Sequence, residues 1–284
     1  MFDNKVLIIA GMHRSGTSLI TQWLSRCGLP VGERLLGPLV GNEEGHFEDL
    51  DFVDVHKEIL REQQLPDTGL ATPAALEVSY HSMQKIKRII FLKNEINNQW
   101  GWKDPRTCLF LPIYRQLIPG ANYFFIVRDY ASSVSSLINR IYYQAEKKYL
   151  ARSWFSAFFW KNIRSKRRKK ILYKKFSQPY LKVWIAYNEQ ILLNISRLPK
   201  HDYILVDYNV LNKEGKLIFS HLKETWNFSL NYFDFNEIFK RNLLTEADDI
   251  SSFVKDKTLL DKAEKLENSL RSFCFTNKYG MRVL

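Results

Sequence analysis

The chain opens with a short apolar run, a loop rich in glycine and hydroxyl residues, and an amphipathic helix. Residues 6–10, Val-Leu-Ile-Ile-Ala, have the length and side chains of a central strand in a parallel sheet. Residues 11–18 read Gly-Met-His-Arg-Ser-Gly-Thr-Ser, and apolar residues then recur at helical spacing from Leu19 to Leu24. This order of strand, tight loop and helix predicts an α/β fold whose first loop leads directly into a helix N-terminus.

The loop has the chemistry of an anion-binding site. Gly11 and Gly16 let the backbone turn tightly, so that its N–H groups can approach a ligand closely. Free N–H groups and the helix dipole favour a bound anion at the start of the helix. The guanidinium of Arg14 and three hydroxyl groups add further donors. We therefore expect a phosphate to be bound by His13, Arg14, Ser15, Gly16, Thr17 and Ser18.

The loop differs from that of nucleoside triphosphatases. Their motif places Lys and then Ser or Thr after the second glycine, whereas here Thr17 follows Gly16 and the cation, Arg14, precedes it. Without the lysine that reaches the β- and γ-phosphates, the loop suits a 5′-phosphate better than ATP hydrolysis. A strand, turn and helix that bind no ligand are the alternative for this segment taken alone.

A second strand and helix carry another set of anion-binding side chains. An aromatic and β-branched strand at 123–128 ends at Arg128, and a helix follows. Ser136 and Arg140 lie one helical turn apart on that helix and share a face. Two guanidiniums and a hydroxyl can therefore converge on one phosphate dianion.

Together the two motifs resemble those of sulfotransferases that use 3′-phosphoadenosine-5′-phosphosulfate (PAPS). The first loop is similar to the 5′-phosphosulfate loop in the arginine-containing form of tyrosylprotein sulfotransferases and related bacterial enzymes. Arg128, Ser136 and Arg140 match the spacing of the family's 3′-phosphate motif, although Tyr130 stands where many members have proline. Tyr208, at the end of an expected strand at 203–208, resembles the family's adenine-contacting tyrosine.

The resemblance implies one domain over residues 1–284, with a P-loop-containing three-layer fold and a mostly parallel sheet flanked by helices. The expected strands are 5–10, 100–103, 123–128 and 203–208. The binding sites for the 3′-phosphate and for the 5′-phosphosulfate are expected as two separate positive pockets, one at each end of the adenosine. The strand order follows from the resemblance alone.

Two further segments supply the candidate catalytic residues. Lys103 ends the strand at 100–103, where parallel sheets place ligand-contacting residues, and Lys-Asp-Pro resembles the tyrosylprotein enzymes, whose lysine steadies the transferred sulfuryl group. A solvated lysine beside a turn is the alternative. Glu48 or His46 is the expected base for the acceptor's proton, with Glu43 and Glu44 as further candidates. Acids before a helix also serve as simple caps.

Positive charge is concentrated in one segment. Nine of the twelve net positive charges lie in residues 161–175, which contain no acid, and an aromatic run at 154–160 precedes them. We expect a basic, aromatic helical insertion at 144–177 and then a helix from Pro179. This segment is a helix pair with a solvated basic face, a site for an anionic acceptor such as a carbohydrate, or a peripheral contact with an anionic membrane through 154–175. Nucleic-acid binding fits the charge, but no recognition motif accompanies it.

Composition narrows the remaining possibilities. Three widely spaced cysteines without a CxxC pair favour reduced thiols in the cytoplasm, and the histidines lack the spacing of a metal site. The first apolar run is too short for a signal peptide or a membrane anchor. We therefore expect a cytoplasmic protein, with peripheral contact at the inner face of the membrane as a further possibility.

The predicted activity is transfer of a sulfuryl group from PAPS to a hydroxyl acceptor, a carbohydrate or another small molecule, without a metal. Arg14 and Lys103 would supply the cations, and Glu48 or His46 the base. Two other classes stay open. One is an ATP-dependent P-loop kinase, and the other is a non-enzymatic adaptor that binds polyanions or membranes.

Overall fold

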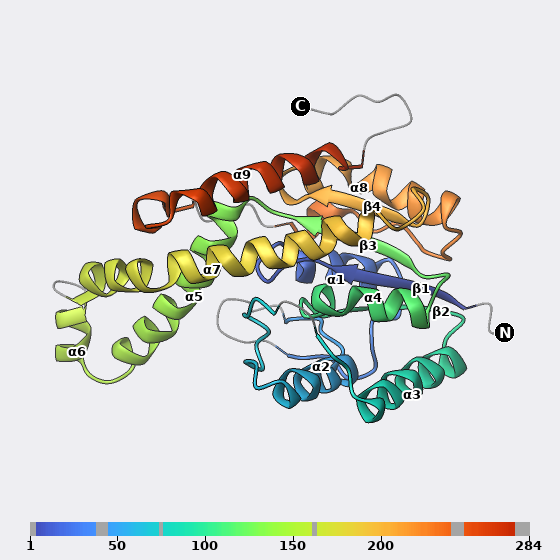
Figure 1. Cartoon of the computed structure of the whole chain (residues 1–284), viewed down its shortest axis with the longest axis horizontal. Coiled ribbons are helices and arrows are strands. Elements are labelled where there is room, and N and C mark those ends of the chain that lie inside the picture. The colour runs from blue at the N-terminus through green and yellow to red at the C-terminus, as the bar shows by residue number, and fades with distance from the viewer. Residues whose placement is uncertain (1–3, 38–44, 74–75, 161–163, 240–246, 276–284) are drawn as a thin grey trace.

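A computed structural model describes residues 4–37, 45–73, 76–160, 164–239 and 247–275 (Figure 1). Its centre is a sheet of four parallel strands in the order β2-β1-β3-β4. The strands are β1 (Lys5–Ala10), β2 (Gln99–Lys103), β3 (Asn122–Val127) and β4 (Tyr203–Asp207). The expected α/β class with a parallel sheet is therefore confirmed.

Helices cover both faces of this sheet. The helices are α1 (Thr17–Arg26), α2 (Leu50–Glu62), α3 (Tyr80–Ile96), α4 (Thr107–Leu117), α5 (Tyr130–Leu150), α6 (Trp154–Phe159), α7 (Ser165–Ile195), α8 (Leu211–Ser220) and α9 (Lys257–Ser272). Short 3₁₀ or π turns lie at 208–210, 221–225, 235–237 and 251–253.

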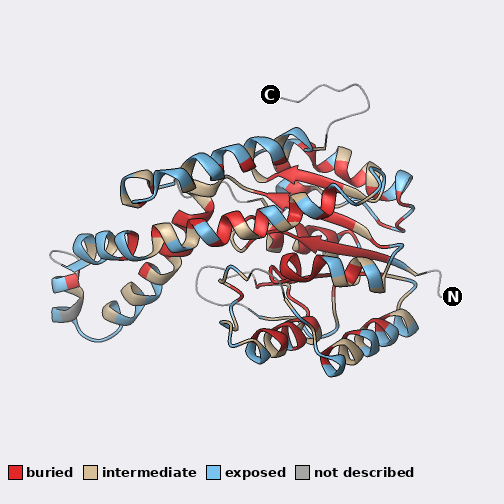
Figure 2. Cartoon of the chain, viewed as in Figure 1, coloured by how far each residue is buried: buried red, intermediate tan, exposed pale blue. Residues whose placement is uncertain are grey.

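Alternation along the first strand explains the two layers. Val6 and Ile8 of β1 point into a core cluster shared with α2, α4, α5, α7 and α9, whereas Leu7 and Ile9 point into a second cluster shared with α1 and α8. Because both faces are covered, the strand is apolar throughout, and Figure 2 shows the sheet as mostly buried.

The register brings the segments with candidate site residues to one end of the sheet. Ile9 pairs with Lys103, Ala10 with Phe125, and Val127 with Asp207. Since all strands run in one direction, the segments that follow β1, β2, β3 and β4 leave the sheet at the same end.

Residues 144–177 differ from the expected insertion. α5 continues to Leu150, and α7 runs unbroken through Pro179, so the helix start expected at Pro179 is wrong. A proline inside a helix removes one hydrogen bond, but Leu181, Trp184 and Tyr187 bury this part of α7 against the core. α5 and α7 lie side by side as a long hairpin, with α6 at its far end (Figure 1).

Across the described ranges, no helix combines the length and the apolar character that crossing a bilayer requires.

Candidate active site

The loop after β1 folds tightly over the edge of the sheet. Arg14 and Gly16 have positive φ angles of 69° and 95°, and the Ser15 N–H donates to the carbonyl of Met12 at 3.1 Å. A Cβ on Gly11 would lie 2.7 Å from the carbonyl oxygen of Ile126, so glycine permits the loop to pass close over β3. The sequence therefore encodes this turn through its two glycines.

The helix that follows leaves its first N–H groups to other acceptors. Gly16 is the N-cap of α1, and within the described part of the chain no side chain caps this end and no acid lies in its first turn. Ser15 does not add a donor as expected, because its hydroxyl donates to the Met12 carbonyl at 2.7 Å. The remaining donors at this end favour an anion.

A group that we call the arginine cluster joins the loop to the second motif. Arg14 Nε donates to Ser136 Oγ at 3.0 Å, and Arg128 Nη1 donates to the carbonyl of Arg14 at 3.1 Å. The Arg128 guanidinium lies 4.7 Å from the centre of the Tyr208 ring. The cluster comprises Arg14, Arg128, Ser136, Arg140 and Tyr208.

Like charges dominate this cluster. Burial, together with the charges of Arg140 and Arg128, lowers the pKa of Arg14 to about 10. Arg128 Nε is buried and has no hydrogen-bond partner among the described residues. A buried guanidinium donor without an acceptor, close to two further guanidiniums, is an environment that an anion would stabilise.

Tyr208 forms a wall of the loop. A Cβ on Gly16 would lie 2.2 Å from the Tyr208 ring, so the ring rests directly on the glycine backbone. The residue follows β4 in the 3₁₀ turn at 208–210. The expected contact with adenine stays a prediction, whereas the ring's position beside Arg128 is a feature of the structure.

A second group, the lysine–glutamate cluster, lies at the other side of the loop. Lys103 Nζ donates to Glu48 Oε1 at 3.0 Å and to Ser18 Oγ at 3.2 Å. His46 Nδ1 lies 3.6 Å from the same Glu48 oxygen. The two favoured base candidates and the candidate cation are thus in contact with each other and with the first turn of α1, while Glu43 and Glu44 lie outside the described residues.

Electrostatics keep this second cluster charged. Burial raises the pKa of Glu48, but the charge of Lys103 and the hydrogen bond with His46 outweigh burial and lower the pKa to about 2. Burial lowers the pKa of Lys103, and Glu48 opposes that shift. Each ion therefore stabilises the charged form of the other in a dry site.

Asp104 was a candidate to cap the next helix or to hold Lys103 in place, but sequence reasoning missed its partners Arg106 and His56. Asp104 Oδ1 accepts from Arg106 Nη1 at 2.7 Å, and Arg106 lies 3.8 Å from Glu48 Oε2. Asp104 Oδ2 accepts from His56 Nδ1 at 2.7 Å, and His56 Nε2 accepts from the Tyr114 hydroxyl at 2.6 Å. The signal was Arg106 itself, two residues after Asp104, but the contact of Asp104 with His56 of α2 cannot be read from local sequence.

Two histidines face the same region. His13 Nε2 and His46 Nε2 are buried and have no hydrogen-bond partner among the described residues. Burial, together with the charge of Arg106, lowers the pKa of His13 to about 4, so this imidazole is neutral at pH 7. Both rings offer a nitrogen to a bound molecule.

A cluster of three acidic residues has the spacing of a metal site, but a lysine ammonium lies among them. Glu33, Asp49 and Asp51 lie close together, but Lys93 Nζ is among them, 2.7 Å from Asp49 Oδ2 and 3.2 Å from Asp51 Oδ2. Asp49 also caps α2 by accepting from the Asp51 N–H. The capping role of this segment therefore falls to Asp49 and leaves the neighbouring Glu48 to the lysine–glutamate cluster.

Comparisons with known proteins give likeness in structure only. No protein-family model matches the chain, and no curated protein matches it significantly. Among solved structures, a sulfotransferase domain from the curacin biosynthetic pathway is 15% identical with a TM-score of 0.43, over 99% of this chain and 94% of that one. A sulfotransferase domain from the Synechococcus PCC 7002 olefin synthase is 15% identical with a TM-score of 0.45, over 96% of this chain and 95% of that one. At these values, neither likeness assigns a fold family or an activity to this chain.

Proposed function

We propose that this protein is a sulfotransferase that moves the sulfuryl group of PAPS to a hydroxyl acceptor. The observation that carries the proposal is the contact between the first loop and the second motif through Arg14 and Ser136. PAPS bears a phosphate at the 3′ position and a phosphosulfate at the 5′ position of one ribose. Two adjoining anion sites therefore suit it.

The contact also corrects the expected separation of the two phosphate-binding sites. They were expected as separate pockets at the two ends of an adenosine, but Arg14, Arg128 and Ser136 form one continuous group. The 3′ and 5′ positions belong to the same sugar ring, so a continuous group matches the substrate better than two distant pockets. ATP has no 3′-phosphate and would leave Arg128 and Arg140 without a charge to bind.

The contacts of Lys103 suit it to stabilise the transferred group. Its ammonium lies beside Ser18 in the first turn of α1, and hence next to the N–H groups proposed to bind the phosphosulfate. Negative charge develops on the sulfuryl oxygens and on the bridging oxygen during transfer, and a fixed cation in a dry site stabilises it. Arg14 belongs to the arginine cluster, where its side chain donates to Ser136, and its role at the sulfuryl group stays a prediction.

Glu48 is the proposed base, with His46 orienting it. While paired with Lys103, the carboxylate is a weak base because its pKa is about 2. The charge of Lys103 is the main cause of this low pKa. When Lys103 also interacts with the bound phosphosulfate, it stabilises the Glu48 carboxylate less, so the pKa and the basicity of Glu48 rise. Glu48 then takes the acceptor's hydroxyl proton, the acceptor oxygen bonds to sulfur, and the bond from sulfur to the phosphate oxygen breaks.

Nucleotide binding provides the first test. Thermal unfolding is measured with adenosine 3′,5′-bisphosphate, 5′-AMP or ATP with Mg²⁺. We expect the bisphosphate at a hundredfold excess over its Kd to raise the Tm by roughly 5 °C or more. The Arg128→Ala variant should lose this shift, whereas Arg115→Ala, on the last turn of α4, should retain it. Stabilisation by ATP alone would favour a kinase and overturn the proposal.

Transfer itself is tested with labelled sulfate. Purified protein is incubated with PAPS carrying the label and with carbohydrate, phenol and lipid-headgroup acceptors. Labelled product that requires both Lys103 and Glu48 supports the proposal. Binding of the bisphosphate without transfer to any acceptor class would contradict it.

A further inference from the structure

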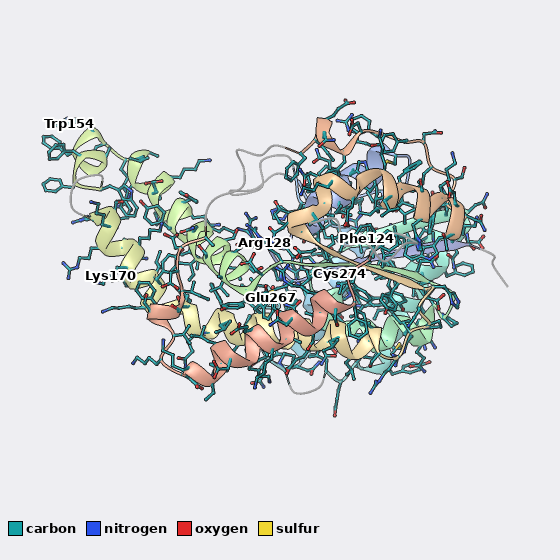
Figure 3. The ribbon with its side chains drawn as sticks, turned by 90° about the horizontal axis from the view of Figure 1, so that it is seen from above. Phe124, Arg128, Trp154, Lys170, Glu267 and Cys274 are labelled. Carbon is teal, nitrogen blue, oxygen red and sulfur yellow. The ribbon has the colours of Figure 1, made fainter. Side chains whose placement is uncertain are left out.

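The far end of the hairpin formed by α5 and α7 presents an aromatic surface to solvent. The side chains of α6 include Trp154, Phe155, Phe158 and Phe159, which are 69%, 57%, 55% and 47% exposed. Figure 3 shows Trp154 at the end of the molecule far from Phe124 of the sheet. Large aromatic side chains exposed together on a soluble surface commonly mark an interaction site.

The tip has its own packing contacts at the adjacent residue, Trp160, while the α6 rings lie in pairs, Trp154 stacked on Phe155 and Phe158 beside Phe159. The adjacent Trp160 is 1% exposed, stacks on Tyr149 at a centroid distance of 4.7 Å, and donates to Glu146 Oε1 at 3.0 Å. The hydroxyls of Tyr142 and Ser165 lie 2.7 Å apart and join the two long helices at the same level. Trp160 therefore anchors the tip, and the four α6 rings beside it stay about half exposed or more.

Basic side chains surround this aromatic tip. Lys166, Arg167, Arg168 and Lys170 are exposed on the first turns of α7, and Lys147 and Lys148 are exposed near the end of α5. Lys169 is used within the protein, because it pairs with Asp248 at 2.9 Å. The exposed lysines and arginines thus lie beside the aromatic tip and give the surface a strong positive charge.

We propose that this tip binds the surface of an anionic lipid bilayer and inserts the α6 aromatics among the headgroups. Tryptophan and other aromatic side chains favour the membrane interface, and basic residues near the surface are attracted to anionic lipids. An acidic protein would satisfy the charge, but a bilayer satisfies both the charge and the apolar rings without a complementary groove.

Distance argues against a role for the tip in holding the reacting acceptor. The 21 residues of α5 separate the tip from Arg128, a length of about 30 Å at 1.5 Å per residue. Figure 3 shows Trp154 at the outer end of the hairpin and Arg128 near its base beside the sheet. A polysaccharide bound only at the tip would lie too far from the arginine cluster for its hydroxyl to react there. The proposal therefore stands independently of the proposed sulfuryl transfer.

Vesicle flotation tests the surface as a whole. The full chain is mixed with vesicles of phosphatidylcholine alone or with vesicles that also contain about 30% phosphatidylglycerol, which makes their surface anionic. We expect flotation with the anionic vesicles and a loss of binding in high salt. Trp154→Ala/Phe158→Ala should weaken partitioning by roughly ten- to a hundredfold, because two aromatic side chains no longer enter the interface. Phe91→Ala/Leu92→Ala removes two exposed apolar side chains from α3 and should have no effect.

Fluorescence distinguishes insertion from electrostatic adsorption. Trp154 is the exposed tryptophan, whereas the other six tryptophans of the chain are at most 7% exposed. Anionic vesicles with brominated acyl chains should quench the emission of the wild type, and Trp154→Phe should bind equally but lose the quenching. Absence of flotation, flotation without quenching, or binding to heparin with none to vesicles would each overturn the proposal.

Discussion

The two charged clusters at the edge of the sheet balance their charges differently. In the lysine–glutamate cluster, Lys103 and Glu48 are buried and hold each other in the charged form. In the arginine cluster, three guanidiniums lie close together, and burial together with the charges of Arg140 and Arg128 lowers the pKa of Arg14. A balanced pair is stable in the unliganded protein, whereas clustered like charges gain stability when an anion binds. This difference is consistent with the proposal that the first cluster takes part in the chemistry and the second binds the nucleotide.

The largest expected effect concerns catalysis by the balanced cluster. Lys103→Met should lower the transfer rate by about 10²–10³-fold, because it removes a fixed cation from the developing negative charge. Binding of adenosine 3′,5′-bisphosphate, which lacks the sulfuryl group, should change little. Single-turnover transfer and calorimetric binding measure the two quantities.

Lys93→Met is the matched control for this variant. Lys93 is also a buried lysine paired with a buried acid, Asp49, but it lies outside the candidate site. Both variants should be less stable, because each leaves an acid without its partner. If Lys93→Met slows transfer as much as Lys103→Met, the rate loss reflects lost stability and the catalytic role is wrong.

The arginine cluster should respond with opposite signs in binding and stability. Arg140→Gln should weaken binding of the bisphosphate by about 10- to 100-fold, since a charge-assisted contact to the 3′-phosphate is lost. The unliganded protein should be equally stable or more stable, because one of three repelling charges is gone. Arg88→Gln, on the exposed face of α3, should change neither quantity. A variant that loses stability without ligand would show that the cluster is structural.

Local sequence patterns were sufficient to predict the strands and to single out most residues of the candidate site. Each strand lies within one residue of its expected bounds, because a short apolar run between polar turns is a local signal. The spacing of Ser136 and Arg140 indicated a shared helix face, with Arg128 at the end of the preceding strand, and the structure places all three close to Arg14. These features depend on residues close together in the chain.

Long-range contacts explain what the sequence did not reveal. Pro179 indicated a helix start, but burial of residues that follow it keeps α7 continuous. Arg106 and His56 meet through Asp104 only because α2 packs beside the end of β2. The role of Ser15 also depends on folding, since its hydroxyl turns back to the Met12 carbonyl. Such contacts depend on the fold and have no local signature.

The close contact between the Tyr208 ring and the backbone of Gly16 can be tested by adding one methyl group at Gly16. Gly16→Ala places a Cβ against the Tyr208 ring at 2.2 Å, at a residue whose φ is 95°. We expect a loss of about 2 kcal/mol in the free energy of unfolding, together with weaker nucleotide binding. Gly28→Ala is a close control, because its φ is 96° and nothing lies within 4 Å of its Cβ position. Equal losses in the two variants, measured by urea unfolding, would show that backbone strain alone is responsible and that Tyr208 is not a fixed wall.

The smallest expected effect is a pH dependence that His13 contributes from the balanced side of the loop. Its pKa is about 4 in the folded protein, against 6.5 as its ordinary value, so the unfolded chain binds the proton more tightly. Stability from the neutral imidazole is therefore complete above pH 6.5 and is lost as the pH falls toward 4. Because His13 as a whole residue is only half-buried, we expect a loss of about 1 kcal/mol between pH 7 and pH 5. His13→Gln should remove this part of the pH dependence in urea unfolding, whereas His81→Gln, at an exposed position on α3, should retain it. If the wild type and the His13→Gln variant have parallel pH profiles, the imidazole takes up a proton in the folded protein about as easily as in the unfolded chain. This side of the loop would then be more open to water than we infer for the lysine–glutamate cluster.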